Sequence, residues 1–407
     1  MLASLKLTSA IAIALGDLQR YQTPQKTSSD GLEISELALD DSQHEKFEPF
    51  IFTTWKCSQA PPWLNKYIFQ PYIRHATSVV RRPSDVIYIS HLLVLSLVGM
   101  PSLVLLFMRF SWIHAVVQEL FVLYFLGPYT IIIHHHMHGR GIMSPRWGWL
   151  DATFPYILGP MMGHNWSSFY YHHKHHHVED NGPGDLSSTL RYDRDSALGM
   201  AYYIARFVLF NWLETPLYYV RKNKLSMAFK SAGGELISLS IVLLLARINF
   251  RAAMTALVLT FVQLRILVIL GNWGQHGFID EEDPGSSFRS SITLVGPTAN
   301  QCSLNDGYHT SHHLAPHRHW YDHPAAFIKA RDKYSSQSAL TFQNISFFGL
   351  AIFLCRKDYG TIADCLVPMG DQVDMTRDEI IAMLKRKTRK FSEVEIEQKF
   401  AKRIASK

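Results

Sequence analysis

The sequence predicts an all-α integral membrane protein, with about four transmembrane helices in two hairpins and a cytosolic helical cap. Three observations support this fold class: long apolar segments, short polar connections between them, and histidine clusters that begin where apolar segments end. The 407 residues carry a net charge of +6 without a dense basic block, which argues against a nucleic-acid partner. The four cysteines form no CxxC pair, which argues against a zinc finger and against a disulfide-stapled scaffold.

The first predicted hairpin consists of residues 86–108 and 111–133. The first segment has no charged side chain and would extend roughly 34 Å as a helix, enough to cross a hydrocarbon core of about 30 Å. The second segment has the same length and contains one acid, Glu119. Only Arg109 and Phe110 connect the two segments, so a tight hairpin is expected.

Arginines flank the outer ends of this hairpin: Arg81, Arg82, Arg140 and Arg146. Because short cytoplasmic loops are enriched in Lys and Arg, both outer ends are expected on the cytosolic side. The histidine clusters would then face the cytosol. The endoplasmic reticulum is the membrane we expect.

The second predicted hairpin spans residues 236–270, with its tip at the polar interruption 247–251. Its first arm is short, so the alternative is one span plus a re-entrant segment. Residues 197–220 contain several polar side chains and are expected to lie in the membrane interface. An even number of crossings then separates the histidine clusters. Arg265 should lie near the cytosolic end, with its side chain extending to the interface.

Three histidine clusters have the spacing of metal-binding sites. In the first, His134 and His138 are four residues apart and share one face of a helix. The second contains two overlapping HxxHH patterns, formed by His172, His175 and His176 or by His173, His176 and His177. The third provides one HxxHH pattern, and an Asn-xxx-His pair precedes it: His309, His312 and His313, with Asn272 and His276.

Neutral imidazole is a common ligand of Zn, Cu, Fe and Ni. A single catalytic zinc usually takes three protein ligands, whereas nine histidines in this spacing are enough for two metals. Neighbouring side chains are further candidates, either for the metal or for hydrogen bonds to its ligands: His135, His136, His175, Asn181 and Asp185. The alternative interpretation is surface histidine tracts with adventitious metal binding.

The HxxxH, HxxHH and HxxHH boxes resemble those of the membrane-bound fatty-acid desaturase and hydroxylase superfamily. The resemblance covers about residues 85–325. It favours the later register of the second box, because Asn181 then occupies the last position of an HxxHHxxxN pattern. Asn272 and His276 look like the additional metal-site element of acyl-CoA desaturases.

The resemblance implies a non-haem di-iron oxidoreductase that uses O₂ to desaturate a fatty acyl chain of a lipid. The metal ligands themselves would be the catalytic groups. No HPGG haem-binding motif occurs, so electrons are expected from a separate carrier of the cytochrome b5 or ferredoxin type. The alternatives are a lipid hydroxylase of the same superfamily, a zinc-dependent membrane hydrolase and a non-catalytic metal-binding membrane protein.

The expected organisation is an N-terminal, partly flexible arm (1–80), a desaturase-like membrane and catalytic domain (81–330) and a cytosolic helical tail (331–407). Two capping-box patterns, Thr376 with Glu379 and Ser392 with Glu395, predict helices in the tail. Aromatic residues after the first box either line the entry of an apolar substrate or anchor the chain at the interface: Trp147, Trp149 and Tyr156.

Overall fold

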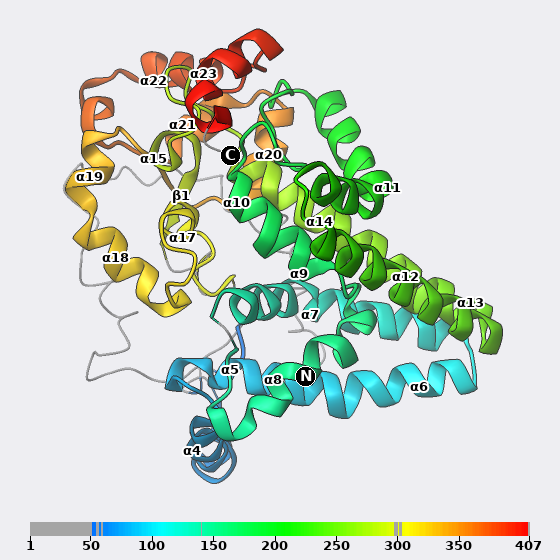
Figure 1. The fold of residues 1–407 in the computed structure, drawn as a ribbon. Helices are drawn as coiled ribbons and strands as arrows, with labels where there is room; N and C mark the ends of the chain where they lie inside the picture. The colour runs from blue at the N-terminus through cyan, green and yellow to red at the C-terminus, as the bar shows by residue number, and fades with distance from the viewer. Residues whose placement is uncertain are drawn as a thin grey trace.

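The computed structural model describes residues 51–53, 57, 60–139, 141–296, 300 and 303–405, without the side chains of His173 and residues 402–405. Figure 1 shows two helical hairpins that extend from a cap of shorter helices. Among the described residues, four helices are long and apolar enough to span a membrane, and they are the four arms of these hairpins. Most of the predicted N-terminal arm lies outside the described residues.

In the first hairpin, residues 109–111 join two apolar arms, as predicted. Its elements are η3 (Pro83–Asp85), α5 (Val86–Val94), η4 (Leu95–Gly99), α6 (Met100–Met108) and α7 (Trp112–Gly139). Helix α7 extends beyond the predicted span of 111–133 without interruption. The first histidine box therefore lies on the last turns of a transmembrane helix.

The second hairpin turns at Asn249, within the predicted tip. Its elements are α12 (Leu225–Ile248), α13 (Phe250–Ala253), η8 (Met254–Val258) and α14 (Leu259–Gln275). The first arm is a full-length helix, so the re-entrant alternative is wrong. The Asn249 side chain accepts a hydrogen bond from Ala252 N–H and donates one to the carbonyl of Phe107, which links the two hairpin tips.

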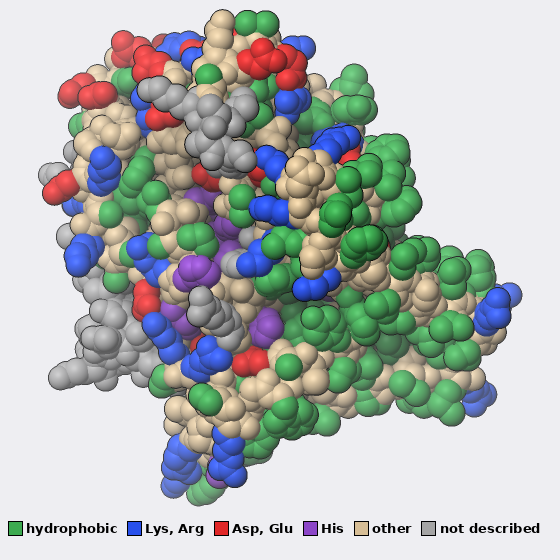
Figure 2. Space-filling view, in the orientation of Figure 1, with side chains coloured by type: hydrophobic (Ala, Val, Ile, Leu, Met, Phe, Trp, Pro, Cys, Tyr) green, Lys and Arg blue, Asp and Glu red, His purple; other side chains and the backbone are tan. Residues whose placement is uncertain are grey.

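Apolar side chains cover the outside of the hairpins. Figure 2 shows this hydrophobic surface, with Lys and Arg side chains at its far end. On α12 the exposed apolar residues include Leu236, Leu239, Leu243, Leu244 and Ile248. An exposed apolar surface of this kind is typical of a lipid-facing bundle.

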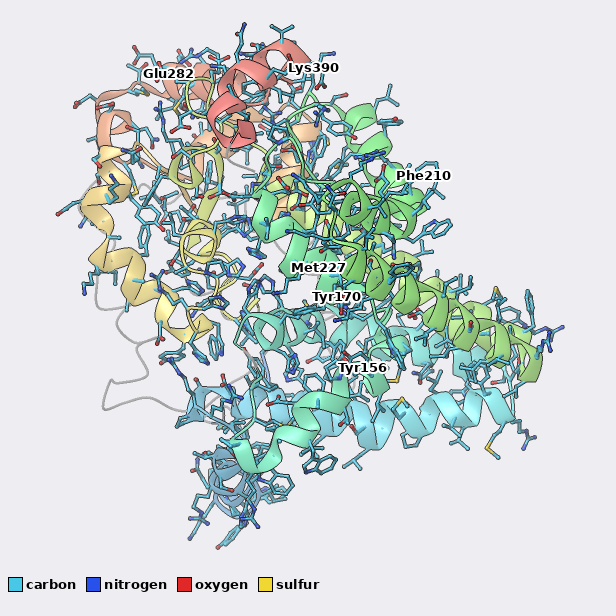
Figure 3. All side chains as sticks on the ribbon, viewed as in Figure 1. Tyr156, Tyr170, Phe210, Met227, Glu282 and Lys390 are labelled. Carbon is cyan, nitrogen blue, oxygen red and sulfur yellow. The ribbon has the colours of Figure 1, made fainter. Side chains whose placement is uncertain are left out.

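Helix α11 (Ala197–Arg221) packs on α12 and α14 and is not among the four candidate spans. Its exposed side includes Tyr202, Phe210 and Trp212, and Figure 3 shows Phe210 projecting outward. Aromatic side chains of this kind are enriched at membrane–water interfaces, which agrees with the predicted interfacial position.

Short helices connect the hairpins and precede them. They are α3 (Pro62–Leu64), η2 (Asn65–Phe69), α4 (Gln70–Val79), η5 (Pro145–Trp147), α8 (Gly148–Leu158), η6 (Pro160–Met162), α9 (Ser168–Tyr171), η7 (His172–His176) and α10 (His177–Glu179).

The cap contains a small sheet that the sequence analysis did not predict. Strand β2 (Leu340–Gln343) pairs in parallel with β1 (Ile292–Val295) and antiparallel with β3 (Leu366–Val367). The cap helices are α15 (Ser287–Ser290), α17 (His309–Leu314), η9 (Trp320–Asp322), α18 (His323–Lys329), α19 (Arg331–Ser336), α20 (Phe347–Cys355), α21 (Tyr359–Asp364), η10 (Gly370–Asp374), α22 (Arg377–Arg386) and α23 (Glu393–Ala405).

The C-terminal helices pack closely on the rest of the molecule. Helix α20 contacts α14 at Gly274, where the Phe347 carbonyl leaves no room for a Cβ. The fully buried Arg194 donates hydrogen bonds to the carbonyls of Lys387 and Arg389. Both predicted capping boxes are present, at the N-termini of α22 and α23.

Candidate metal centre

The side chains of the first histidine box point in different directions. His134 and His138 face the centre of the molecule, one helical turn apart on α7. His135 instead contacts the Tyr88 hydroxyl at 2.5 Å, and His136 Nε2 donates to the carbonyl of Asp151 at 3.0 Å. Only two of the four adjacent histidines thus reach the other boxes.

The second box lies on a π-helical turn, η7, which differs from the α-helical spacing assumed for both HxxHH registers. Because a π-helix has a wider turn than an α-helix, side chains five residues apart lie on the same face. The Nε2 atoms of His172 and His177 are accordingly 3.1 Å apart. His176 points to a different group. The Nε2 atom of His175 lies 3.2 Å from the Gly184 carbonyl, and the side chain of His173 is outside the described part of the structure.

The third box, on α17, divides in the same way. The Nε2 atom of His312 lies 2.9 Å from that of His134 and 3.1 Å from that of His177. His309 and His313 point to the other side, with their Nε2 atoms at 2.9 Å. One short helix therefore supplies imidazoles to two separate groups.

The first of these groups, the five-histidine group, consists of His134, His138, His172, His177 and His312. One ring nitrogen of each lies within 4.8 Å of the others. The rings also contact one another edge to face, for example His138 with His177 at 4.3 Å between centroids. Residues far apart in the sequence thus converge on a space of the size that one metal ion needs.

The second, the three-histidine group, consists of His176, His276 and His313, with ring nitrogens again within 4.8 Å. His309 lies beside it, with its Nε2 atom 3.1 Å from that of His276. His276 follows the last turn of α14, so it arrives from the second hairpin. The Nδ1 atoms of His276 and His309 are buried without a hydrogen-bond partner among the described residues.

Two carboxylates hold the outer nitrogens of the three-histidine group. Asp185 Oδ2 lies 2.8 Å from His176 Nδ1, and Asp180 Oδ1 lies 2.5 Å from His313 Nδ1. Asn181 supports this arrangement, because its N–H donates to Asp185 and its side-chain oxygen accepts from Thr189 N–H. Both Asp180 and Asn181 adopt positive φ, which places Asn181 in a turn.

The electrostatics keep most of these rings neutral, which is the form that binds metal. Burial and the neighbouring imidazoles lower the pKa of His177, His309 and His312 well below 6.5, and burial lowers the pKa of His276 to about 3. Burial also disfavours the charged form of His176, but Asp185 outweighs it and raises the His176 pKa.

Asn272 lies one helical turn before His276 on α14. Its amide nitrogen donates to the Tyr203 hydroxyl at 2.6 Å and to the Ser187 carbonyl at 3.1 Å. These bonds fix the amide orientation at the edge of the histidine groups.

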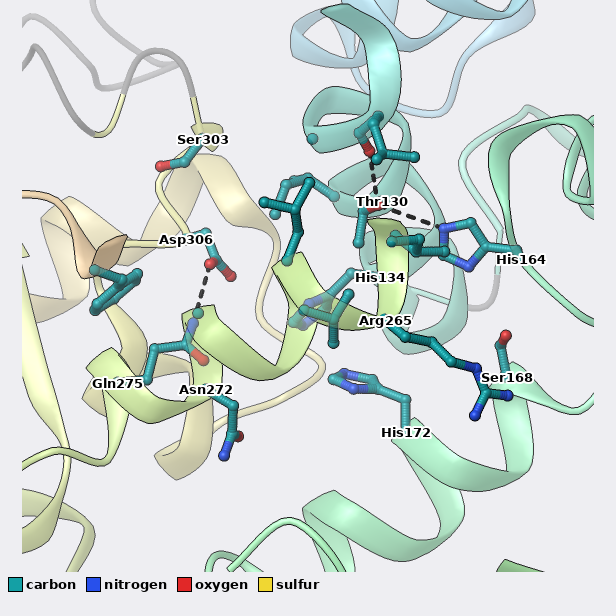
Figure 4. A pocket seen from close by; sticks show the side chains of 18 of the residues that line it. Thr130, His134, His164, Ser168, His172, Arg265, Asn272, Gln275, Ser303 and Asp306 are labelled. Atoms are coloured by element: carbon teal, nitrogen blue, oxygen red, sulfur yellow. Dashed lines mark hydrogen bonds between the residues drawn. The ribbon is translucent and has the colours of Figure 1, made fainter. Parts of the chain in front are cut away.

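A cavity of about 290 Å³ reaches both histidine groups. Figure 4 shows His134 and His172 at its centre, with Gln275 and Asp306 on one side and Arg265 and Ser168 on the other. Its apolar wall comes from α7, α11, α14 and α20 and includes Leu126, Ile131, Phe207, Phe261, Leu264, Val268 and Phe347. The sequence did not predict this wall, because its residues cannot be told apart from the other apolar residues of the same helices.

The three aromatic residues considered for substrate entry lie elsewhere. Trp149 and Tyr156 are exposed on α8, where Figure 3 labels Tyr156, and Trp147 precedes that helix. None of the three lines the cavity as the described residues define it. The exposure of Trp149 and Tyr156 agrees better with anchoring at the interface, whereas Trp147 is partly buried against the core.

Arg265 also differs from its predicted position. Its residue exposure is 7%, it lines the cavity, and its Nη2 lies 3.5 Å from Glu235 Oε1. The expectation that it extends to the interface is therefore wrong, because Glu235 on α12 provides a buried partner. The sequence feature that could have indicated a functional role for Arg265 is its position inside an apolar span, where charged residues are rare.

A sequence model of fatty acid desaturases matches residues 110–343, more than half of the chain. The chain belongs to the fatty acid desaturase family. The match extends from the start of α7 to β2 and includes both histidine groups and α14. Comparisons of the chain with curated proteins and with solved structures gave no significant match. Family membership supports a membrane-embedded oxidoreductase that acts on lipids.

Proposed function

We propose that this protein is an O₂-dependent non-haem di-iron enzyme that desaturates an acyl chain of a lipid. The observation that carries the proposal is the convergence of two histidine groups on one largely apolar cavity. A cavity with this lining accepts a hydrocarbon chain and brings its methylene groups next to both groups. Family membership supports the same reaction class.

The residues fit two iron ions. One would be held among the five-histidine group and the other by the three-histidine group, with His309 beside it. All these donors are imidazoles, a ligand type that suits iron, and burial keeps most of them neutral. When bound, the irons would supply O₂ activation and the removal of two hydrogens from adjacent carbons.

The protein itself contributes position and environment. Asp185 and Asp180 fix the orientation of two imidazole rings, and hydrogen bonds of this kind also make a ligand more basic. The apolar wall aligns the acyl chain and excludes water from the reacting methylene groups. No protein nucleophile takes part in this proposal.

Hydroxylation of the same lipid is the second candidate, because the same residues would serve both reactions. The two differ in the product: desaturation removes two hydrogens, and hydroxylation adds one oxygen. Electrons would come from a separate carrier of the cytochrome b5 or ferredoxin type. The arginines that flank the first hairpin favour histidines that face the cytosol, and we propose the endoplasmic reticulum as the membrane.

The test is metal analysis followed by product analysis. Elemental analysis of full-length protein purified in detergent should give about two irons per chain, as in two-metal sites. Cells that express the protein should then contain a lipid two mass units lighter than its precursor, and the His276→Ala/His312→Ala variant should not form it. One tightly bound zinc per chain would contradict the proposal and favour a membrane hydrolase.

A further inference from the structure

Arg265 lines the cavity and forms an ion pair with Glu235 behind it, between two of the four apolar helices. Arg265 comes from α14 and Glu235 from α12, and both side chains are largely buried. Ser167 donates a hydrogen bond of 2.5 Å to Glu235 Oε1, which fixes the carboxylate. Burying such a pair in an apolar bundle costs free energy, and ionisable side chains inside membrane spans usually serve a function.

One donor of this pair has no acceptor. Arg265 Nη1 is buried without a hydrogen-bond partner in the described part of the chain, while Nη2 faces Glu235. The guanidinium lies over the Phe261 ring at 4.2 Å, so its plane is held in place. Figure 4 shows the Arg265 side chain reaching toward Ser168, on the side of His172 away from Gln275.

The position of Arg265 relates this donor to the metal centre. Arg265 precedes Asn272 by seven residues on one helix, which corresponds to about 10 Å along the axis. Asn211 and His164 line the same cavity and are polar as well. A lipid in the cavity would therefore meet a polar region on the membrane side of the histidine groups.

We propose that Arg265 and Glu235 form a binding site for an oxygen atom of the substrate lipid. Glu235 already balances the arginine charge, so the site is suited to a neutral acceptor, a hydroxyl or carbonyl oxygen, more than to a carboxylate. Binding of this oxygen fixes how many carbons separate it from the reacting carbons of the lipid chain. The inference rests on the proposed function only in treating the bound lipid as the substrate.

The experiment measures equilibrium binding of three labelled probes with equal chain length to the full-length purified protein. The probes are hexadecanol, palmitate and hexadecane. Wild-type protein should bind hexadecanol more tightly than hexadecane, and at least as tightly as palmitate. A hydrogen bond to a charged group corresponds to a preference of roughly tenfold or more.

Two variants separate the roles of the pair. Arg265→Met/Glu235→Gln removes both charges, so no lone buried charge is left, and it should abolish the preference for hexadecanol over hexadecane. Glu235→Gln alone keeps the donor and removes the carboxylate, so it should tighten palmitate binding and leave hexadecanol binding nearly unchanged. Arg251→Met, an exposed arginine at the tip of the same hairpin, is the matched control and should change nothing.

An unchanged hexadecanol preference in the double variant would overturn the proposal, and so would weaker palmitate binding in Glu235→Gln. Binding is read without turnover, so the outcome is independent of the reaction. If the variants behave as expected but no desaturated or hydroxylated product forms, the oxygen site stands and the proposed function fails. If product forms and the double variant binds like wild type, the oxygen site alone fails.

Discussion

Carboxylates contact two of the three rings of the three-histidine group, whereas the rings of the five-histidine group pack more closely against one another. Asp185 and Asp180 contact the outer nitrogens of His176 and His313. In the five-histidine group the ring centroids of His134 and His312 are 4.5 Å apart. The first arrangement depends on charged hydrogen bonds and the second on the placement of helices, so the two groups should respond differently to the same kind of mutation.

The largest expected effect is the loss of one imidazole from the smaller group. His276→Ala leaves two of three members, fewer than a catalytic metal usually needs, so the iron content should fall from about two to about one per chain. Product formation should fall to background. His172→Ala leaves four members in the larger group and should retain more iron. Elemental analysis and lipid profiling of both variants measure the difference, and equal losses would show that the groups are not distinct in this way.

The next prediction removes a carboxylate and leaves every imidazole in place. Asp185→Asn should weaken metal binding at the three-histidine group by about 10- to 100-fold, the usual cost of losing such a partner. Iron retention during dialysis against a chelator measures this effect. Asp364→Asn, which breaks an exposed pair with Arg377, is the control. Equal retention by wild type and Asp185→Asn would mean that ring packing, as in the larger group, is sufficient.

A third prediction concerns the surroundings of the five-histidine group. His323 packs near His312, its Nδ1 lies 2.9 Å from Ser311 Oγ, and burial lowers its pKa to about 3. In the unfolded chain its pKa returns to about 6.5, so the unfolded state binds the extra proton and stability falls as pH decreases below that value. Between pH 7.5 and 5.5 this one side chain should cost about 1.4 kcal/mol.

His323→Phe should remove that part of the acid sensitivity. The measurement is the unfolding midpoint of chelator-treated protein at both pH values, for wild type and variant. The exposed His75→Phe serves as the control, because it makes the same substitution outside the buried core. If wild type and His323→Phe lose stability in parallel, His323 is not held neutral in the folded protein.

The sequence predicted the two hairpins well, because charge-free segments of membrane-spanning length have few alternative structures. The tip at Asn249 followed from the polar interruption, and the helices after Thr376 and Ser392 followed from their capping boxes. Each of these features depends on neighbouring residues only. Local sequence patterns were therefore sufficient to predict this part of the fold.

The division of the histidines between two groups could not be predicted in the same way. The π-helical turn at His172–His176 changes which side chains share a face, and no spacing rule for an α-helix reveals it. The pairing of Arg265 with Glu235 and of β1 with β2 joins distant segments. Long-range contacts of this kind depend on the whole packed structure.

The smallest expected effect tests whether the cap influences the histidine groups at all. The Thr376 side chain accepts a hydrogen bond from the N–H of Glu379 at the N-terminus of α22. Thr376→Ala should therefore lower stability by about 1 kcal/mol. Helix α22 packs in the cap core rather than at the metal centre, so iron content and product should stay at wild-type levels. Thermal unfolding and elemental analysis of one preparation measure both quantities. A loss of iron in this variant would mean that the C-terminal packing around Arg194 transmits strain to the second histidine box, and the contrast between the two groups would then reflect the cap as well as their own partners.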